Sequence, residues 1–178
     1  MTPTTPVRLL RSMPLVALVQ PRLNELTREL NESCSIAILD DLDVVYIARS
    51  PAHSLTRDYL SVGTRLPAHV TSVGKLLFAA LPEAMLLEKV SRIRFEKLAP
   101  HTITDRMTLL KEIREAGRQG YAISDQEAAL GLRSIGVPLM NGHETVAALS
   151  MSTEIGRLTR NDLKKRLLPA LLRAAASS

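Results

Sequence analysis

Several serines in this chain are spaced so that their hydroxyl groups could meet at one polar ligand. Ser150 and Ser152 lie two residues apart in a run with β-strand composition, so both side chains point to the same face of the strand. Ser72 follows a loop that contains Pro67 and precedes an apolar run with helical spacing, which predicts a hydroxyl at a helix N-terminus, where N–H groups favour anions. The pattern indicates a binding pocket. Its alternatives are a serine that only caps the helix and a serine pair on a solvent-facing strand.

A carboxylate ligand would need strong donors, and three residues are candidates. Arg65 or Arg133 could supply a planar, bidentate guanidinium, and His69 could supply one more donor. Taken alone, each arginine is more typical of a surface or structural role, and His69 lies in an apolar segment where a core histidine is the commoner outcome. Ser124 precedes the acids Asp125 and Glu127, which are typical of a loop as often as of a site.

Other chemistries have little support in the sequence. The chain has one cysteine, Cys34, which excludes an internal disulfide and is expected to be a buried small side chain. Its four histidines have no metal-binding spacing, and there is no P-loop or dinucleotide fingerprint, so no metal and no cofactor are predicted. Ser72 lacks the G-x-S-x-G frame. We therefore assign no catalytic residue and expect no enzyme, although a triad assembled from distant positions would leave a small hydrolase open.

The net charge is +5 and the isoelectric point is near 9.7. The basic residues are dispersed, and two Phe, three Tyr and no Trp give no aromatic series for stacking bases, so a solvated basic surface is favoured over a direct DNA site. No apolar run approaches the roughly 20 residues of a membrane span, and no signal peptide is visible, so we expect a cytoplasmic protein without membrane contact.

The elements that must position these residues alternate along the 178-residue chain. Helical spacing predicts helices over residues 15–31 with a kink near Pro21, 73–81 capped by Ser72, 82–90, 104–119 capped by Thr104, and from Thr159 to Ala176 with a bend at Pro169. Strands are predicted over residues 33–39, 44–49, 56–62, 121–124, 133–139 and 145–152, with a turn at 40–43 and a hairpin at Asn141-Gly142. Hairpins flanked by helices predict an α+β domain with a largely antiparallel sheet.

Six segments together resemble the effector-binding domain of the IclR family of bacterial transcription regulators. They are Leu26-Thr-Arg-Glu-Leu-Asn-Glu-Ser-Cys-Ser-Ile-Ala-Ile-Leu39, Val44-Val-Tyr-Ile-Ala-Arg49, Leu66-Pro-Ala-His-Val-Thr-Ser-Val-Gly-Lys75, Gly120-Tyr-Ala-Ile-Ser-Asp-Gln-Glu127, Gly131-Leu-Arg-Ser134 and Ala148-Leu-Ser-Met-Ser152. The segments follow the family's order over roughly residues 14–176. Residues 59–68 are similar to the branch that controls protocatechuate and β-ketoadipate catabolism.

The resemblance implies a GAF-like or profilin-like architecture and a set of pocket residues. Ser72 and Val73 match the loop that lines the family's ligand pocket. Leu132, Ser134, Ser150 and Ser152 match positions where the family places an apolar wall and polar ligand contacts on adjacent strands. The chain departs from the family at Ser134, where many members have cysteine, and at Ser124, where many have an acid.

The resemblance also implies a function and partners. The expected effector is a small aromatic or aliphatic carboxylate, and the expected assembly is a homodimer or tetramer whose arrangement the ligand controls. We expect residues 1–13 to be a linker remnant and 14–178 the effector domain. No helix-turn-helix precedes them here, so DNA would be contacted only through a missing N-terminal winged helix-turn-helix. A stand-alone protein that forms mixed oligomers with a full-length regulator and a small hydrolase are the alternatives.

Overall fold

The computed structural model describes the backbone of residues 5–52 and 60–176, and the side chains of those residues from Met13 onward. Its centre is a six-stranded antiparallel sheet in the order β3-β2-β1-β6-β5-β4. The strands are β1 Ser33–Asp40, β2 Asp43–Ser50, β3 Arg65–Pro67, β4 Ala122–Asp125, β5 Leu132–Asn141 and β6 Glu144–Glu154. The first strand, β1, pairs with the last strand, β6, at the middle of the sheet.

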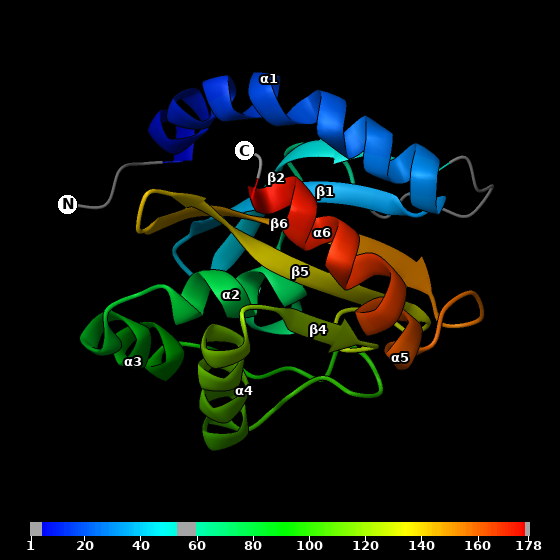
Figure 1. The fold of residues 1–178 in the computed structure, drawn as a ribbon. Helices are drawn as coiled ribbons and strands as arrows, with labels where there is room; N and C mark the ends of the chain where they lie inside the picture. The colour runs from blue at the N-terminus through cyan, green and yellow to red at the C-terminus, as the bar shows by residue number, and fades with distance from the viewer. Residues whose placement is uncertain (1–4, 53–59, 177–178) are drawn as a thin grey trace.

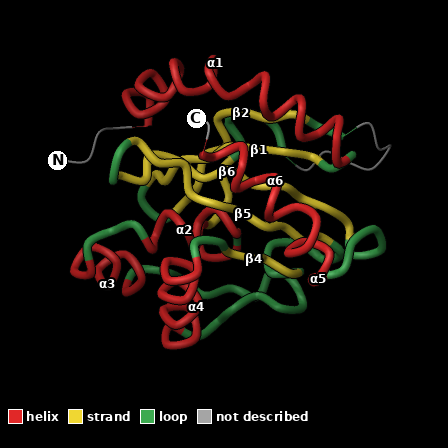
Figure 2. Tube along the Cα trace, in the orientation of Figure 1, coloured by secondary structure: helices red, strands yellow, loops and turns green. Residues whose placement is uncertain are grey.

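Helices cover both faces of this sheet, as Figures 1 and 2 show. One face carries α1 and the C-terminal helical segment, and the other carries the short helix η1 with α2, α3 and α4. Their bounds are α1 Thr5–Leu30, η1 Ala68–Val70, α2 Ser72–Ala79, α3 Glu83–Ser91, α4 Arg106–Gln119, α5 Arg160–Asp162, the π-helical turn η2 Leu163–Leu167, and α6 Leu168–Ala176. The predicted α+β class with an antiparallel sheet is confirmed.

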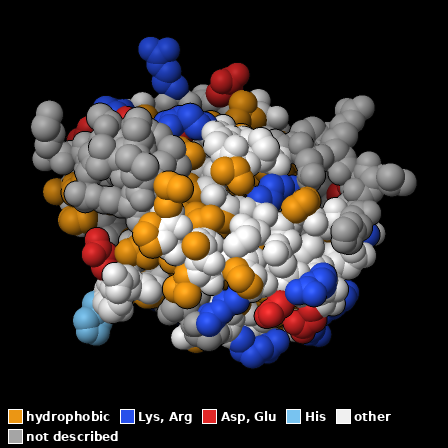
Figure 3. All heavy atoms as spheres, turned by 90° about the horizontal axis from the view of Figure 1, so that it is seen from above, with side chains coloured by type: hydrophobic (Ala, Val, Ile, Leu, Met, Phe, Trp, Pro, Cys, Tyr) orange, Lys and Arg blue, Asp and Glu red, His pale blue; other side chains and the backbone are white. Residues whose placement is uncertain are grey.

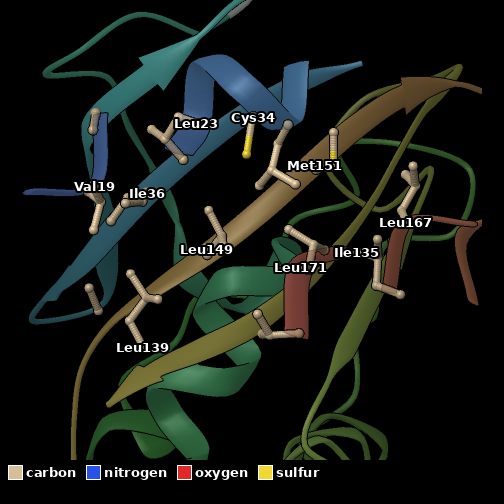
Figure 4. Packing of buried hydrophobic residues seen from close by; sticks show 14 of the residues in the cluster. Val19, Leu23, Cys34, Ile36, Ile135, Leu139, Leu149, Met151, Leu167 and Leu171 are labelled. Carbon is tan, nitrogen blue, oxygen red and sulfur yellow. The ribbon is translucent and has the colours of Figure 1, made fainter. Parts of the chain in front are cut away.

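The alternation of strand side chains divides the core into two clusters. On the α1 side, Leu23, Ile36 and Leu149 pack with Leu171 of α6 (Figure 4), and Cys34 lies buried among them, as predicted. Burial raises the pKa of the Cys34 thiol to about 12. On the α2 side, the cluster comprises residues of α2, α3 and α4 packed on Ala37, Val44, Tyr46, Ala122 and Ala148. Because successive strand residues point to opposite faces, small residues on the α2 side leave room for α2 to lie close to the sheet.

Two predicted helix caps were wrong, and one predicted strand was wrong in the part that the structure describes. Thr71 caps α2 instead of Ser72, because its Oγ1 accepts the N–H of Gly74 at 2.9 Å. Asp105 caps α4 instead of Thr104, because its carboxylate accepts the N–H of Thr108 at 2.8 Å. Of the strand predicted over 56–62, residues 56–59 lie outside the described residues, and residues 60–62 lead as a loop and turn into β3.

Prolines mark the other differences. Helix α1 continues through Pro14 and Pro21 and therefore starts ten residues before the predicted start at 15. Its packing through Val19, Leu23 and Leu26 offsets the cost of the missing N–H groups. At Pro169, where a bend was predicted, the backbone has no N–H to donate to the carbonyl four residues earlier. The helix has a wider, π-helical turn, η2, which ends two residues before this proline.

The predictions for the end of α4, the hairpin turn and the start of the C-terminal helical segment are confirmed. Gly120, with φ of 80°, ends α4, and Gly142, with φ of 62°, starts the two-residue turn between β5 and β6. Thr159 starts the C-terminal helical segment through a reciprocal capping box with Asp162. Among the described residues, no helix combines the length and apolar character that crossing a membrane requires.

Candidate functional site

Four serines form a row across four neighbouring strands. In the strand register, Ser33 of β1 pairs with Ser152 of β6, Ser152 pairs with Ser134 of β5, and Ser134 pairs with Ser124 of β4. Directly paired residues point to the same face of a sheet, so the row presents one hydroxyl from each strand to that face.

A second row lies two residues further along the strands and faces the same side. Arg49 of β2 pairs with Ser35 of β1, Ser35 pairs with Ser150 of β6, and Ser150 pairs with Gly136 of β5. The Nη1 of Arg49 donates to the Ser35 Oγ at 3.3 Å. We call Ser33, Ser35, Ser124, Ser134, Ser150 and Ser152, together with Arg49, the serine face.

The serine face lies on the α2 side of the sheet. Ala37 of β1 and Ala148 of β6, which continue the same alternating set, belong to the cluster that packs against α2. Their sequence neighbours Ile36 and Leu149 belong to the opposite cluster beneath α1. Of the serines, Ser35, Ser124 and Ser150 are buried, and the other three are partly exposed.

The start of α2 lies directly over this face. Ser72, the first residue of α2, is 1% exposed, and its Oγ accepts a hydrogen bond from the Ser134 Oγ at 3.0 Å. Helix α2 also lies close to Gly136, where a Cβ would come within 3.2 Å of the Leu149 carbonyl oxygen and 3.3 Å of Leu76 Cδ1. The N-terminal end of α2 and the serine row are therefore in direct contact.

Ser124 fixes the other side of this junction. Its Oγ donates to the carbonyl of Val70 at 2.8 Å, which ties β4 to the residues just before α2. Val73 is fully buried in the α2-side cluster, so it limits the space between helix and sheet from within the core. Leu132 is partly buried and, two residues before Ser134 on β5, points to the same face.

His69 is buried beside the same junction. Its ring makes an edge contact with Phe95, with the ring centroids 5.6 Å apart, and burial lowers its pKa, so the imidazole is neutral at pH 7. Within the described part of the chain, its Nε2 has no hydrogen-bond partner.

The two arginines considered as carboxylate ligands lie away from the serine face. Arg133, between Leu132 and Ser134 on β5, points to the opposite face, where its Nε donates to Asp125 at 2.9 Å and its Nη1 to the Leu158 carbonyl at 2.6 Å. Arg65 pairs with the α1-facing Val45 and binds Asp40 and Asp43 at 2.8 and 3.3 Å. The strand period of two residues separates both guanidinium groups from Ser150 and Ser152.

Three residues of the serine face, Ser33, Ser35 and Arg49, were not predicted from the sequence. The signal was present, because Ser33 and Ser35 have the same two-residue spacing as Ser150 and Ser152. It could not be used because only the register places Arg49 of β2 beside Ser35 of β1, and Ser35 beside Ser150 of β6.

A buried ion pair holds α2 from its other side. Lys75 is 1% exposed, and its Nζ donates to the Ile123 carbonyl at 3.0 Å and lies 2.8 and 3.0 Å from the two carboxylate oxygens of Glu127. Burial raises the pKa of Glu127, while the ammonium of Lys75 opposes that rise. The pair anchors α2 to β4, and both elements contribute serines to the site.

The arrangement offers hydroxyl groups, a helix N-terminus and one guanidinium, which suits recognition of a small anion with further polar groups. Among the described residues, no cluster of three His, Cys, Asp or Glu side chains could hold a metal ion.

Comparison with known proteins identifies the domain. The family model described as bacterial transcriptional regulator IclR C-terminal matches residues 7–178. The chain belongs to the IclR family. As an IclR domain, it is 40% identical over 168 residues to the Pca regulon regulatory protein of Pseudomonas putida, a match that covers 93% of this chain and 58% of that protein. The chain thus spans less than two thirds of that relative's length.

Solved structures agree with this assignment. A transcriptional regulator from Rhodococcus sp. RHA1 superposes with a TM-score of 0.89 at 37% identity, covering 91% of this IclR chain and 65% of the other. The inducer-binding domain of the Acinetobacter transcription factor PobR, solved as a double mutant with 3-hydroxybenzoic acid, gives a TM-score of 0.86 at 32% identity and covers 91% and 95% of the two chains. The similar proteins that carry names are transcription regulators.

Proposed function

We propose that this chain is the effector-sensing domain of an IclR-type regulator of aromatic catabolism, and that it binds a small aromatic carboxylate on the serine face. The observation that carries the proposal is the pair of polar rows on one face of an otherwise apolar sheet, in contact with the N-terminus of α2. A sheet face built only for packing would not bury Ser35 and Ser150 at its centre.

The likeness to the PobR inducer-binding domain and to the Pca regulator supports this ligand class. The PobR structure is a complex with 3-hydroxybenzoic acid. An arginine can bind the carboxylate of such an acid, and serines can form hydrogen bonds with its ring hydroxyl. In the proposed site, Ser72, Ser124, Ser134, Ser150 and Ser152 contribute hydroxyls, Leu132 and Val73 contribute apolar walls, and His69 contributes its ring nitrogen.

We further propose that ligand binding shifts the arrangement of a homodimer or tetramer and that DNA is read by a winged helix-turn-helix outside this chain. Helix α1 is placed to sense the site, because Gln20 Nε2 donates to the carbonyl of Arg49 at 3.0 Å and Thr27 Oγ1 to that of Ser50 at 3.0 Å. The shift in that equilibrium is limited to the ligand's difference in affinity between the two arrangements.

Calorimetric titration with 3-hydroxybenzoate, 4-hydroxybenzoate, protocatechuate and β-ketoadipate tests the proposal. We expect at least one to bind and to be recovered unchanged, and Ser150→Ala to weaken it roughly 2- to 10-fold through the loss of one hydrogen bond. Ser91→Ala is the matched control, since Ser91 is an exposed serine on α3 that donates to the Glu88 carbonyl. Binding of none of these acids would refute the ligand class, and recovery of a bound acid in altered form would favour an enzyme.

A further inference from the structure

The excess of basic over acidic residues lies in one short segment of the chain. Residues 157–166, Arg-Leu-Thr-Arg-Asn-Asp-Leu-Lys-Lys-Arg, contain five Arg or Lys and one Asp, which gives a net charge of +4. The whole chain carries +5, so basic and acidic residues nearly balance over the rest of it. We call residues 157–166 the basic segment. Clustered charge of one sign is typical of a surface that binds a polyanion.

The helix geometry of the basic segment turns its cations outward together. Leu163 and Leu167 are fully buried in the cluster on the α1 side. The three residues between them, Lys164, Lys165 and Arg166, are exposed. All five belong to the π-helical turn η2, and a wider turn holds more residues, so successive side chains differ less in direction than in an α-helix. The three cations therefore point to a narrow arc of the surface.

The three cations of η2 are not taken up in ion pairs with the residues that the structure describes. Asp162, the one acid of the segment, feels two of them only at longer range, and its carboxylate accepts hydrogen bonds from the N–H and Oγ1 of Thr159 at 2.8 Å each. Lys164 also lines a small polar cavity with Glu112 and Glu115, whose carboxylates already face cations of α2 and α4. Positive charge is thus left for an anion outside the chain.

We propose that the basic segment binds the phosphate backbone of duplex DNA, independently of base sequence. The inference rests on the proposed function, in which DNA is read outside this chain, and adds a contact that the chain makes itself. Because the chain belongs to a family of transcription regulators, DNA is the polyanion beside which it works.

The dimensions and the chemistry of the segment fit a phosphate backbone. Residues 160–166 extend about 10 Å at the helical rise of about 1.5 Å per residue. DNA carries one charge per about 1.7 Å of its axis, so several phosphates face that length. Lysine is a compact point charge that suits phosphate, and the segment contains no aromatic side chain that could stack on a base. Contacts to phosphates carry no sequence information.

Fluorescence anisotropy with two labelled duplexes of about 20 base pairs and unrelated sequence tests the proposal. We expect the wild-type chain to bind both equally and to lose about 100-fold in affinity between about 50 and 200 mM salt, since the three cations of η2 and the exposed Arg160 neutralise about four phosphates. The triple variant Lys164→Gln/Lys165→Gln/Arg166→Gln should bind more weakly and keep only about a 3-fold dependence on salt.

The matched control removes the same charge from the α2 side of the molecule. In Arg92→Gln/Arg114→Gln/Arg118→Gln, each arginine that is lost binds a carboxylate in the wild-type chain. This variant should keep the affinity for DNA and its salt dependence close to the wild-type values. If the triple variant in η2 does not fold, Lys165→Gln replaces it, and the salt dependence should then fall by about 3-fold.

Each other outcome overturns the proposal. If the wild-type chain binds neither duplex at low salt, the DNA contact is refuted, while the effector-sensing function stands on its own titration. Equal losses in the two triple variants would mean that net charge attracts DNA and that the basic segment does not. A preference for one duplex would show that bases are read. Binding of poly-glutamate without binding of DNA would assign the segment to an acidic protein partner instead.

Discussion

Gly74 sits where helix α2 comes closest to the backbone before it. A Cβ at this position would lie 1.9 Å from the carbonyl oxygen of Ala68, and backbone atoms cannot yield as the end of a side chain can. The same turn places the Thr71 Oγ1 between the Gly74 N–H and the Ala68 carbonyl, at 2.9 and 3.0 Å. One glycine therefore allows the tight junction that puts Ser72 over the serine face.

We expect Gly74→Ala to destabilise the fold by about 3 kcal/mol, the upper end of the usual cost of overpacking, because α2 must move away from Ala68. Urea unfolding followed by circular dichroism measures the change. Gly156→Ala is the control, since a Cβ there meets nothing within 4 Å. If both variants unfold at the same urea concentration, the junction does not depend on the close approach at Gly74.

At this scale the sequence predicted residue types better than residue roles. The spacing of Ser150 and Ser152 predicts a shared face, and the register places Ser152 beside Ser134 and Ser150 beside Gly136. The arginines show where prediction from the sequence ends. The position of a residue within a strand decides which face of the sheet its side chain points to, but the sequence does not say which face binds the ligand. Arg133 is one residue from Ser134 and lies on the other side of the sheet.

Among the elements, helix α2 is held in place by the buried ion pair of Lys75 and Glu127. The pair lies between α2 and the residues after β4, and the exposed Glu112 of α4 adds a carboxylate oxygen 3.5 Å from the Lys75 Nζ. The net contribution of such a buried pair to the free energy of folding is small, but removing one partner leaves the other charge buried without an opposite charge.

We expect Lys75→Met to cost about 3–5 kcal/mol at neutral pH, and the double variant Lys75→Met/Glu127→Gln to recover much of that loss. Because the folded-state pKa of Glu127 is raised above its ordinary 4.5, its contribution to stability is present at low pH and is lost as the pH rises through the raised value. Lys75→Met should therefore be less destabilised at pH 5 than at pH 8. Urea unfolding at both pH values measures this, and equal losses would contradict the role of Glu127.

The elements themselves were largely predictable, because helical and strand spacing, the Asn141-Gly142 turn and the capping signal at Thr159 are local. The caps of α2 and α4 were each misplaced by one residue, since neighbouring Thr, Ser and Asp are all good caps and tertiary contacts decide among them. Strand β3 is three residues long and forms only through pairing with β2, so no local pattern indicates it.

At the scale of the whole molecule, one end of the sheet carries an apolar groove of about 1180 Å³. Residues from α1, α2, α3 and the β5–β6 hairpin line it, among them Leu18, Met85 and Met140, which are 59%, 42% and 44% exposed. Seen from the α1 side, hydrophobic side chains gather on part of the surface (Figure 3). Exposed apolar surface of this extent is typical of an interaction site.

We expect the chain to sediment as a dimer or tetramer and Leu18→Glu to shift it toward the monomer, because a carboxylate at the groove would be desolvated by any partner. Met107→Glu is the matched control, since Met107 is 72% exposed on α4, outside the groove. Sedimentation velocity over a range of concentrations measures both. A monomeric wild-type chain would contradict the proposed assembly, and an unaltered Leu18→Glu oligomer would exclude the groove as its contact.

The pairing of β1 with β6 has a further consequence for the order in which the molecule is built. Ser35 and Ser150 are neighbours in the sheet but are separated by most of the chain, so closing that pair is slow and entropically costly. During synthesis, the first hairpin emerges early and waits with an open edge until β6 leaves the ribosome. The serine face therefore forms only after β6 has been synthesised, later than the first hairpin, which supplies Ser33 and Ser35.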